Sequence, residues 1–276
     1  MALPAHANGS SRAVHAPEPP TVWGKLMEHR PALWRAASVG LFFLAWEIAG
    51  RVPISYAFPT FLETLRAFIG MLLDGSLLAA YGQTLQPLVI GIAVSALLGV
   101  GIGIVMGLSR FAEWLVAPVF IVLQAAPMAA LIPLITFVYG IGLLAKTLAV
   151  IMLALPVIAL NGYKAVRNAN PSLVAMCRSF QGTRWQTITR IIIPDASPVI
   201  FAGLRLGLAA GFIGVILAEL LITPTGIGDL ITYHRSVAEY PQMYAAVVSI
   251  ILVSTLTLAA LEAFELRVLR PEKRTS

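Results

Sequence analysis

The feature that most constrains this chain is the stretch 84–108, which contains no charged side chain. A helix of about 20 apolar residues is long enough to cross the roughly 30 Å hydrocarbon core of a bilayer. Charged residues make up 12% of the whole chain, which is about half the share carried by soluble domains. We therefore predict an all-α integral membrane protein.

Further apolar stretches indicate that the chain crosses the membrane six times. The predicted spans are 36–50, 84–108, 114–138, 142–161, 198–222 and 243–264. Three prolines in the third span predict a broken helix, because each proline removes a backbone hydrogen bond. The amphipathic stretch 60–75 predicts an interfacial helix outside the membrane, and its apolar content is also compatible with a shallow re-entrant segment.

The sequence divides into three parts around these spans. Residues 1–35 are predicted to form a disordered tail followed by a basic, aromatic segment at the membrane surface. Residues 36–268 form the predicted six-span domain, and residues 269–276 form a basic C-terminal tail. A signal peptide is not expected, because no charged region leads directly into an apolar core at the start.

Lysine and arginine residues are distributed unequally between the two sides of the predicted membrane domain. Of the 19, 14 lie on one side and four on the other, and Arg205 lies within the fifth span. Cytoplasmic loops of membrane proteins carry the excess of positive charge. Both termini and the segment 162–197 are therefore predicted to be cytoplasmic. The same topology accounts for the net charge of +6 without nucleic acid as a partner.

The sequence gives no support for catalysis or for a cofactor bound by this chain. It contains no G-x-x-x-x-G-K-[ST] loop for ATP, no H-E-x-x-H and no G-x-S-x-G. A single cysteine excludes a disulfide framework within one chain, and four scattered histidines do not predict a metal site. The functions that remain for this chain are transport and a structural role.

The longest polar interruption between the spans is 170–198. Asn170 is the expected N-cap of a helix whose first residue is Pro171. Residues 181–183 predict a turn, and a second helix is expected to begin at Arg184. An exposed helix–turn–helix of basic and apolar residues suits insertion into a groove on another protein. The alternative is a loop whose basic residues serve only to fix the topology.

The stretch 178–221, RSFQGTRWQTITRIIIPDASPVIFAGLRLGLAAGFIGVILAELL, resembles the permease subunits of bacterial ABC importers. The nearest group carries nitrate, sulfonate, taurine and bicarbonate. The cytoplasmic signature of this family is E-A-A, three residues, G, nine residues and I-x-L-P. Counted back from Pro194, the E-A-A positions fall on 175–177 and the glycine position falls on Gln181, one residue before Gly182. The following R-W-Q and the I-x-I-P are kept.

The resemblance extends over residues 36–268. The stretch 125–146, AAPMAALIPLITFVYGIGLLAK, is similar to the family pattern P-x-x-A-x-x-P-L followed by G-x-G-x-x-x-K, and TGIGDLI also matches. In this family a coupling helix in the cytoplasmic segment, between spans 4 and 5, docks on the ATPase. The resemblance assigns this role to Ala175, Met176, Cys177, Arg178, Gln181, Gly182, Arg184, Trp185 and Pro194.

The resemblance also implies the partners and the location of the protein. We expect two copies of an ABC ATPase, which would bind ATP and Mg²⁺, and a second permease chain of identical sequence. An extracytoplasmic binding protein would deliver the solute. The permease itself would lie among the lipids of the bacterial cytoplasmic (inner) membrane as a multi-pass protein.

Seven residues in the spans and in the loop that follows the fifth span are candidates for a translocation pathway or gate. They are Gln124, Pro127, Met128, Arg205, Glu219, Gly226 and Gly228. Arg205 and Glu219 are fourteen residues apart, or about 21 Å along a helix, so they are not expected to pair with each other. Arg205 has an ion pair as its alternative role, and Glu219 has hydrogen bonds to the nearby turn. Lys146 is expected to snorkel to the outer surface.

The glycines of Thr225-Gly226-Ile227-Gly228-Asp229 permit a tight re-entrant turn, which is either an outer gate or an ordinary connector. The solute suggested by resemblance is a small anion: an aliphatic sulfonate, taurine, nitrate or bicarbonate. Import of a pyrimidine vitamin precursor or of riboflavin is an alternative, because related permeases carry these. A gradient-driven secondary transporter is a further alternative, but it would need mid-membrane carboxylates or paired broken helices that the sequence lacks.

Overall fold

The computed structural model describes residues 31–52, 56–222 and 225–269, and every regular element in these ranges is a helix. The helices are α2 (Pro31–Arg51), α3 (Phe61–Leu73), α4 (Ser76–Leu108), α5 (Arg110–Ala125), α6 (Met128–Tyr139), α7 (Leu143–Arg167), α8 (Pro171–Ser179), α9 (Arg184–Thr187), the π-helical turn η1 (Ile188–Ile192), α10 (Ile193–Leu221), α11 (Ile227–Ser236) and α12 (Tyr240–Leu269). The predicted disordered tail and all but the start of the C-terminal tail lie outside the described residues.

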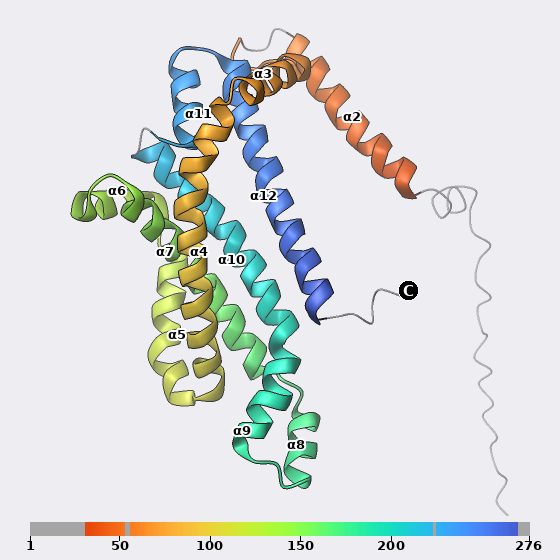
Figure 1. Ribbon diagram of the computed structural model, residues 1–276, viewed down its shortest axis with the longest axis vertical. Coiled ribbons are helices and arrows are strands. Elements are labelled where there is room, and N and C mark those ends of the chain that lie inside the picture. The colour runs from red at the N-terminus through yellow and green to blue at the C-terminus, as the bar shows by residue number, and fades with distance from the viewer. Residues whose placement is uncertain (1–30, 53–55, 223–224, 270–276) are drawn as a thin grey trace, which may run out of the picture.

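The centre of the molecule is a bundle of α4, α7 and α10 (Figure 1). Glycines on α4 allow α7 to approach closely. A Cβ atom on Gly99 would lie 2.9 Å from Ile158 Cγ2, and one on Gly103 would lie 2.7 Å from the Ala159 carbonyl oxygen. Both distances are shorter than a normal contact, so larger residues would push the two helices apart. Gly99 and Gly103 are therefore packing positions in the contact between α4 and α7.

The predicted third span is broken, as its prolines indicated. α5 and α6 meet at Ala126 and Pro127 with a bend of 101°. Ala126 has extended backbone angles, which is the conformation favoured for a residue before proline. Pro118 and Pro133 lie inside α5 and α6 without breaking them. Figure 1 shows α6 projecting sideways from the bundle.

The fifth span begins earlier than its predicted boundary at residue 198. The helical path is continuous from Arg184 to Leu221, because α9, η1 and α10 follow one another without a break. The π turn ends at Ile192, two residues before Pro194, whose missing N–H favours such an irregularity. Pro198 likewise leaves the Pro194 carbonyl without its helical donor, and the Ser197 hydroxyl donates to it at 2.8 Å. The cytoplasmic segment therefore runs directly into the membrane helix.

By length and composition, four helical stretches of the described chain qualify as membrane spans. They are α4, α7, the continuous α9–η1–α10 and α12, and the bent pair α5–α6 makes a fifth if it counts as one span. α2, the predicted first span, has 21 residues but carries Glu47 and Arg51 and is not among the four. The amphipathic stretch 60–75 contains the helix α3, whose N-terminus has a capping box formed by Thr60 and Glu63.

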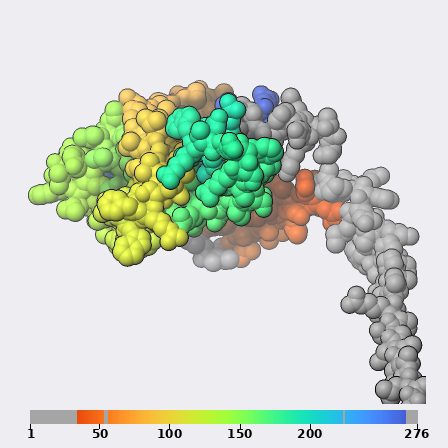
Figure 2. Space-filling model, turned by 90° about the horizontal axis from the view of Figure 1, so that it is seen from below, coloured from red at the N-terminus to blue at the C-terminus, as the bar shows by residue number. Residues whose placement is uncertain are grey.

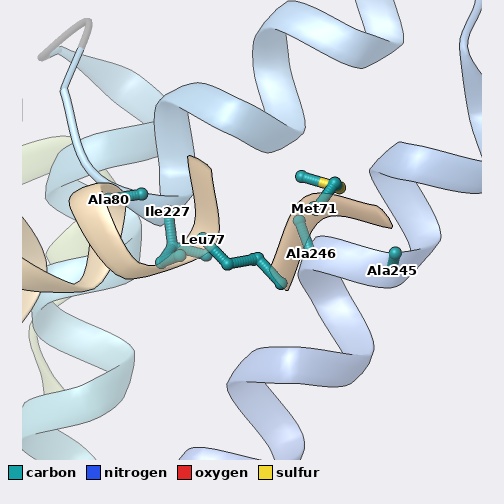
Figure 3. Packing of buried hydrophobic residues seen from close by; sticks show 6 residues of the cluster. All are labelled: Met71, Leu77, Ala80, Ile227, Ala245 and Ala246. Carbon is teal, nitrogen blue, oxygen red and sulfur yellow. The ribbon is translucent and has the colours of Figure 1, made fainter. Parts of the chain in front are cut away.

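One end of the bundle is closed by α3 and α11. Figure 3 shows Met71 of α3, Leu77 of α4, Ile227 of α11 and Ala246 of α12 in one buried cluster. From this end α2 extends at an angle, so that it diverges from the bundle along its length (Figure 1). It is attached to α3 through the rings of Phe43 and Phe61, whose centroids are 4.5 Å apart. The opposite end of the molecule carries α8 and α9.

Candidate functional site

The predicted helix–turn–helix of the 170–198 segment is present as α8 and α9. The Asn170 side chain accepts a hydrogen bond from the Ser172 amide at 2.9 Å, and Pro171 is the first helical residue, so both cap predictions are confirmed. The Asn170 amide donates to the Asp195 carboxylate of α10 at 2.8 Å. This bond ties the start of α8 to the start of the membrane helix.

The turn between α8 and α9 depends on two neighbouring residues. Gln181 has a φ of 55°, one of two positive values among the non-glycine residues described. The next amide, of Gly182, donates to the Cys177 carbonyl at 2.9 Å and closes the end of α8. A Cβ atom on Gly182 would lie 2.5 Å from Cys177 Sγ, so no larger residue fits. Gln181 occupies the glycine position of the family signature, as counted from the sequence. It is also the residue with the left-handed backbone.

The second helix is fixed by local contacts as well. Thr183 and Gln186 form a reciprocal capping box at the start of α9. The Thr187 hydroxyl lies 3.5 Å from Cys177 Sγ and so joins the two helices. Both helices are therefore held in one arrangement by side chains close in sequence.

Large apolar side chains at this tip are left uncovered. Phe180 is 81% exposed, Trp185 is 73% exposed, and Met176 is also exposed. Ala175, Arg178, Arg184 and Pro194 are exposed around them. Figure 2, which views the molecule from this end, shows the segment in green and teal at the front. Exposed aromatic residues surrounded by arginines are typical of a surface that binds another protein.

The opposite end of the bundle contains a buried ion pair. Lys146 Nζ of α7 lies 2.8 Å from Glu219 Oε1 of α10, and the two side chains are 5% and 0% exposed. The expectation that Lys146 snorkels to the surface is therefore wrong. A buried carboxylate 2.8 Å away stabilises the ammonium inside the protein, so it does not need to reach water.

Several further bonds satisfy this pair. The Lys146 ammonium donates to the Thr225 hydroxyl and carbonyl at 2.9 and 3.1 Å. Glu219 accepts from the Thr84 hydroxyl and from the Gly228 amide, each at 3.0 Å. The Ile227 amide in turn donates to Thr84 Oγ1 at 3.0 Å. The network, defined by Thr84, Lys146, Glu219, Thr225, Ile227 and Gly228, joins α4, α7, α10 and the start of α11.

The two glycines predicted to form a turn lie against this network. Gly226 has a φ of 89°, and a Cβ atom on it would overlap the Glu219 carboxylate. A Cβ atom on Gly228 would overlap the Glu219 side chain and approach its backbone. The close approach of the α10–α11 connection to Glu219 is thus possible only with glycine. The predicted hydrogen bonding of Glu219 to this turn is present, although residues 223–224 lie outside the described residues.

The remaining candidates lie elsewhere. Arg205 is close to Glu262 and Glu265 of α12, with N···O distances of 3.3 and 3.4 Å. It does not pair with Glu219, as the spacing predicted. Gln124 and Pro127 are exposed and Met128 is half-buried at the α5–α6 bend. The structure thus brings Glu219, Gly226 and Gly228 together but leaves Arg205 and the bend residues apart.

Sequence reasoning missed Lys146, Thr84 and Thr225 as members of the network. One signal was present: Lys146 and Glu219 are opposite charges, each placed near the outer end of a predicted span. Because an unpaired charge is unfavourable in the membrane interior, the two could have been matched as partners.

Comparison with known proteins identifies the architecture. Residues 99–270 match the family described as the binding-protein-dependent transport system inner membrane component. The chain belongs to this family. It is a multi-pass inner-membrane component of an ABC importer, and members of the family act with a separate ATPase and a binding protein. The permease therefore carries out transport, and ATP hydrolysis belongs to another chain.

Individual relatives are similar in sequence, and one solved structure is similar in fold. The chain is 26% identical over 227 residues to a putative aliphatic sulfonates transport permease protein, SsuC, of Bacillus subtilis (strain 168), covering 82% of each chain. It is 34% identical over 152 residues to the riboflavin transport system permease protein RibX of Chloroflexus aurantiacus, covering 55% of this chain and 56% of the relative. The inward-facing MetNI methionine ABC transporter has a similar fold, with a TM-score of 0.55 at 17% identity over 69% of this chain and 96% of that chain.

Proposed function

We propose that α8 and α9 form the coupling helix and adjoining turn of this permease, and that they dock on the ATPase subunit. The observation that carries this proposal is the exposure of Phe180 and Trp185 on a rigidly capped tip. Burying two aromatic side chains against a partner provides a strong anchor, since each contributes a large apolar area. ATP and Mg²⁺ belong to that partner in this proposal.

The tip is well suited to transmit force. α9 continues through η1 into α10 without interruption, and the bond from Asn170 to Asp195 ties α8 to the same helix. A displacement of the tip by closing ATPases would therefore move α10 directly. Such a displacement can shift the membrane domain between two states when ATP is bound elsewhere.

We further propose a six-span topology in which α2 is the first span and both termini are cytoplasmic. The excess of Lys and Arg on the side that carries α8 and α9 supports this orientation. Two permease chains, identical in sequence, would stand between two ATPase subunits. Reagents that cannot cross the membrane should label a cysteine at Tyr56 from outside and a cysteine at Phe180 only after the membrane is opened.

The proposed solute is a small anion of the aliphatic sulfonate class, which also includes taurine, with nitrate and bicarbonate as related anions. The similarity to SsuC over most of both chains supports this class. A vitamin or vitamin precursor is the second candidate, because the similarity to RibX is higher in identity, although it covers about half of each chain. ATP-driven uptake of taurine, nitrate and riboflavin into proteoliposomes would distinguish the two.

The experiment that tests the proposed function is copurification with the neighbouring ATPase in nanodiscs, followed by ATP hydrolysis with and without the binding protein. We expect a stable complex in which the wild-type permease supports stimulated hydrolysis. We expect Phe180→Ala with Trp185→Ala to lose the complex while remaining folded and membrane-inserted. Copurification of this double variant at the wild-type level would refute docking through α8 and α9.

A further inference from the structure

A small pocket with polar residues in its lining lies beside the buried ion pair at the end of the molecule opposite α8 and α9. It has a volume of about 200 Å³ and is lined by Gln83, Gln86, Gly142, Leu143, Lys146 and Thr225. The lining comes from α4, from the start of α7 and from the connection that leads into α11. A pocket of this size holds roughly six water molecules at ~30 Å³ each, or one small polar group.

The two glutamines present free amide groups to this pocket. Gln83 and Gln86 are one turn apart on α4 and both are exposed. Neither side chain has a hydrogen-bond partner among the described residues. Further along α4, a second pocket of about 340 Å³ is lined only by apolar residues and glycine, among them Leu97 and Val105. The polar lining is therefore particular to the end of α4 that lies near the ion pair.

The ion pair presents its positive member to the pocket. Lys146 lines the pocket, whereas the Glu219 side chain is completely buried behind it. The two charges are 2.8 Å apart, so the pocket lies at the positive end of a buried dipole. Electrostatic effects of this kind are stronger inside a protein than in water, because the local dielectric is low.

Thr225 carries this polarity to the pocket surface. Its hydroxyl oxygen accepts from Lys146 Nζ at 2.9 Å, which leaves the hydroxyl hydrogen available for another acceptor. A hydroxyl that accepts from an ammonium is a stronger donor itself. The pocket thus offers three available donor groups, on Gln83, Gln86 and Thr225, and the Glu219 carboxylate is not part of its lining.

We propose that this pocket is the solute-entry site of the permease and that it binds an oxyanion group, such as a sulfonate. The three donors would hydrogen-bond the oxygens of the anion while Lys146, neutralised from behind by Glu219, polarises them. Because the charge of Lys146 is already neutralised by Glu219, the anion would be held by hydrogen bonds and not by an unpaired buried cation. The solute can therefore be bound and also be released. The inference rests on the proposed import of a small anion.

Cysteine labelling with reagents of opposite charge tests the proposal without requiring transport. Cys177, the only cysteine of the chain, is first replaced by Ser, and Gln86→Cys is introduced in the full complex in membranes. The probes are methanethiosulfonate reagents that carry a sulfonate (MTSES) or a trimethylammonium group (MTSET). Leu78→Cys is the matched control, because Leu78 is exposed at the same end of α4 but does not line the pocket.

We expect the ratio of the MTSES rate to the MTSET rate to be about tenfold higher at position 86 than at position 78, since a cleft lined by one sign of potential concentrates the opposite ion. Ethanesulfonate should slow labelling at position 86 and not at position 78. Thr225→Val should weaken this protection, because it removes a donor and keeps the side-chain shape.

Two results would overturn the proposal. One is the absence of labelling at position 86 from outside while position 78 reacts, which would mean that lipid or a second chain covers the pocket. The other is a ratio of the MTSES rate to the MTSET rate that is equal or lower at position 86 than at position 78. Failure of sulfonate uptake, with the charge preference and the protection intact, would instead reject the proposed transported solute and leave the anion pocket standing.

Discussion

The two ends of the α10 helix are built in opposite ways. At the α8–α9 end, aromatic side chains are exposed, and the backbone is held by caps whose partners lie within ten residues of each other, apart from the bond between Asn170 and Asp195. At the other end, a lysine and a glutamate 73 residues apart in the sequence are buried together. The first end is held by local contacts and is exposed to a partner. The second end already has its partners inside the chain.

Under the proposed function, α10 links an end that moves with the ATPase to an end that is held within the chain. Changes at the exposed tip should affect binding and coupling more than folding. Changes in the buried network should affect folding first, because removal of either charge leaves the other without compensation. Stability should therefore respond most strongly to substitutions in the buried network and least to those at the exposed tip.

The largest effect is expected for Lys146→Met. The Glu219 carboxylate would be left buried without its counter-charge, and loss of one partner of a buried pair costs about 3–5 kcal/mol. The double variant Lys146→Met/Glu219→Gln should recover a large part of this loss, because the amide keeps an acceptor for Thr84 and Gly228. Thermal unfolding in nanodiscs measures both variants.

The control for this comparison is Arg51→Met, which breaks the ion pair with Glu47 on α2. The Arg51 side chain is 70% exposed, so we expect no measurable change in the unfolding temperature. Equal unfolding temperatures for Lys146→Met and Arg51→Met would show that the buried pair does not stabilise this end.

The next effect is expected for Gly226→Ala. The backbone at this position has a φ of 89° and a ψ of −165°, a region that is essentially restricted to glycine and disfavours alanine by about 1–3 kcal/mol, and the added methyl group would also displace the Glu219 carboxylate. Gly75→Ala is a control for a positive φ without a close contact, since Gly75 has a φ of 80° and a ψ of 0° and open space around its Cβ position. The unfolding temperature of Gly226→Ala should be clearly the lower of the two. Similar values would mean that the contact with Glu219 contributes nothing.

A smaller effect of opposite sign is expected at the exposed end for Gln181→Gly. Glycine relieves the left-handed strain at this position, with a net gain of about 0.5–1 kcal/mol after its greater freedom in the unfolded chain is counted. Slower hydrogen exchange of the α8 amides would report the gain. Gly182→Ala should speed the same exchange, because its methyl group collides with Cys177 Sγ. Faster exchange in Gln181→Gly would contradict the left-handed turn.

The smallest effect on stability is expected for Trp185→Ala. Its side chain is largely exposed, so the free energy of unfolding should change by less than about 0.5 kcal/mol. ATP hydrolysis stimulated by the binding protein should nevertheless fall severalfold, because the anchor on the ATPase is lost. Stimulation at the wild-type level would place the ATPase contact elsewhere on the permease.

The difference between the locally held α8–α9 end and the buried network also explains which features could be predicted from the sequence. The Asn170 cap, Pro171 and the turn at residues 181–183 depend on neighbours in the chain, so their pattern was sufficient to locate them. The partner of Lys146 depends on how α7 and α10 pack, which no local pattern contains. A charge near the end of a span was therefore interpreted as snorkelling, when the fold places a carboxylate beside it.

The broken third span could be predicted from the sequence only in part. Its three prolines predicted a break, because proline removes a helical hydrogen bond, and a break is present. Only Pro127 ends a helix, whereas Pro118 and Pro133 are accommodated inside α5 and α6. Membrane helices tolerate proline when neighbouring groups satisfy the freed carbonyl, and that depends on packing. The sequence could therefore predict that the span is broken, but not at which proline.

The central claim, that the exposed tip is where the permease meets its ATPase, is tested most directly by cross-linking. In the Cys177→Ser background, Phe180→Cys is treated with a short bifunctional maleimide in membranes that contain the ATPase, and Tyr56→Cys at the other end serves as the control. We expect a covalent permease–ATPase product from position 180 and none from position 56. The absence of this product from position 180, in a complex that still hydrolyses ATP, would contradict it.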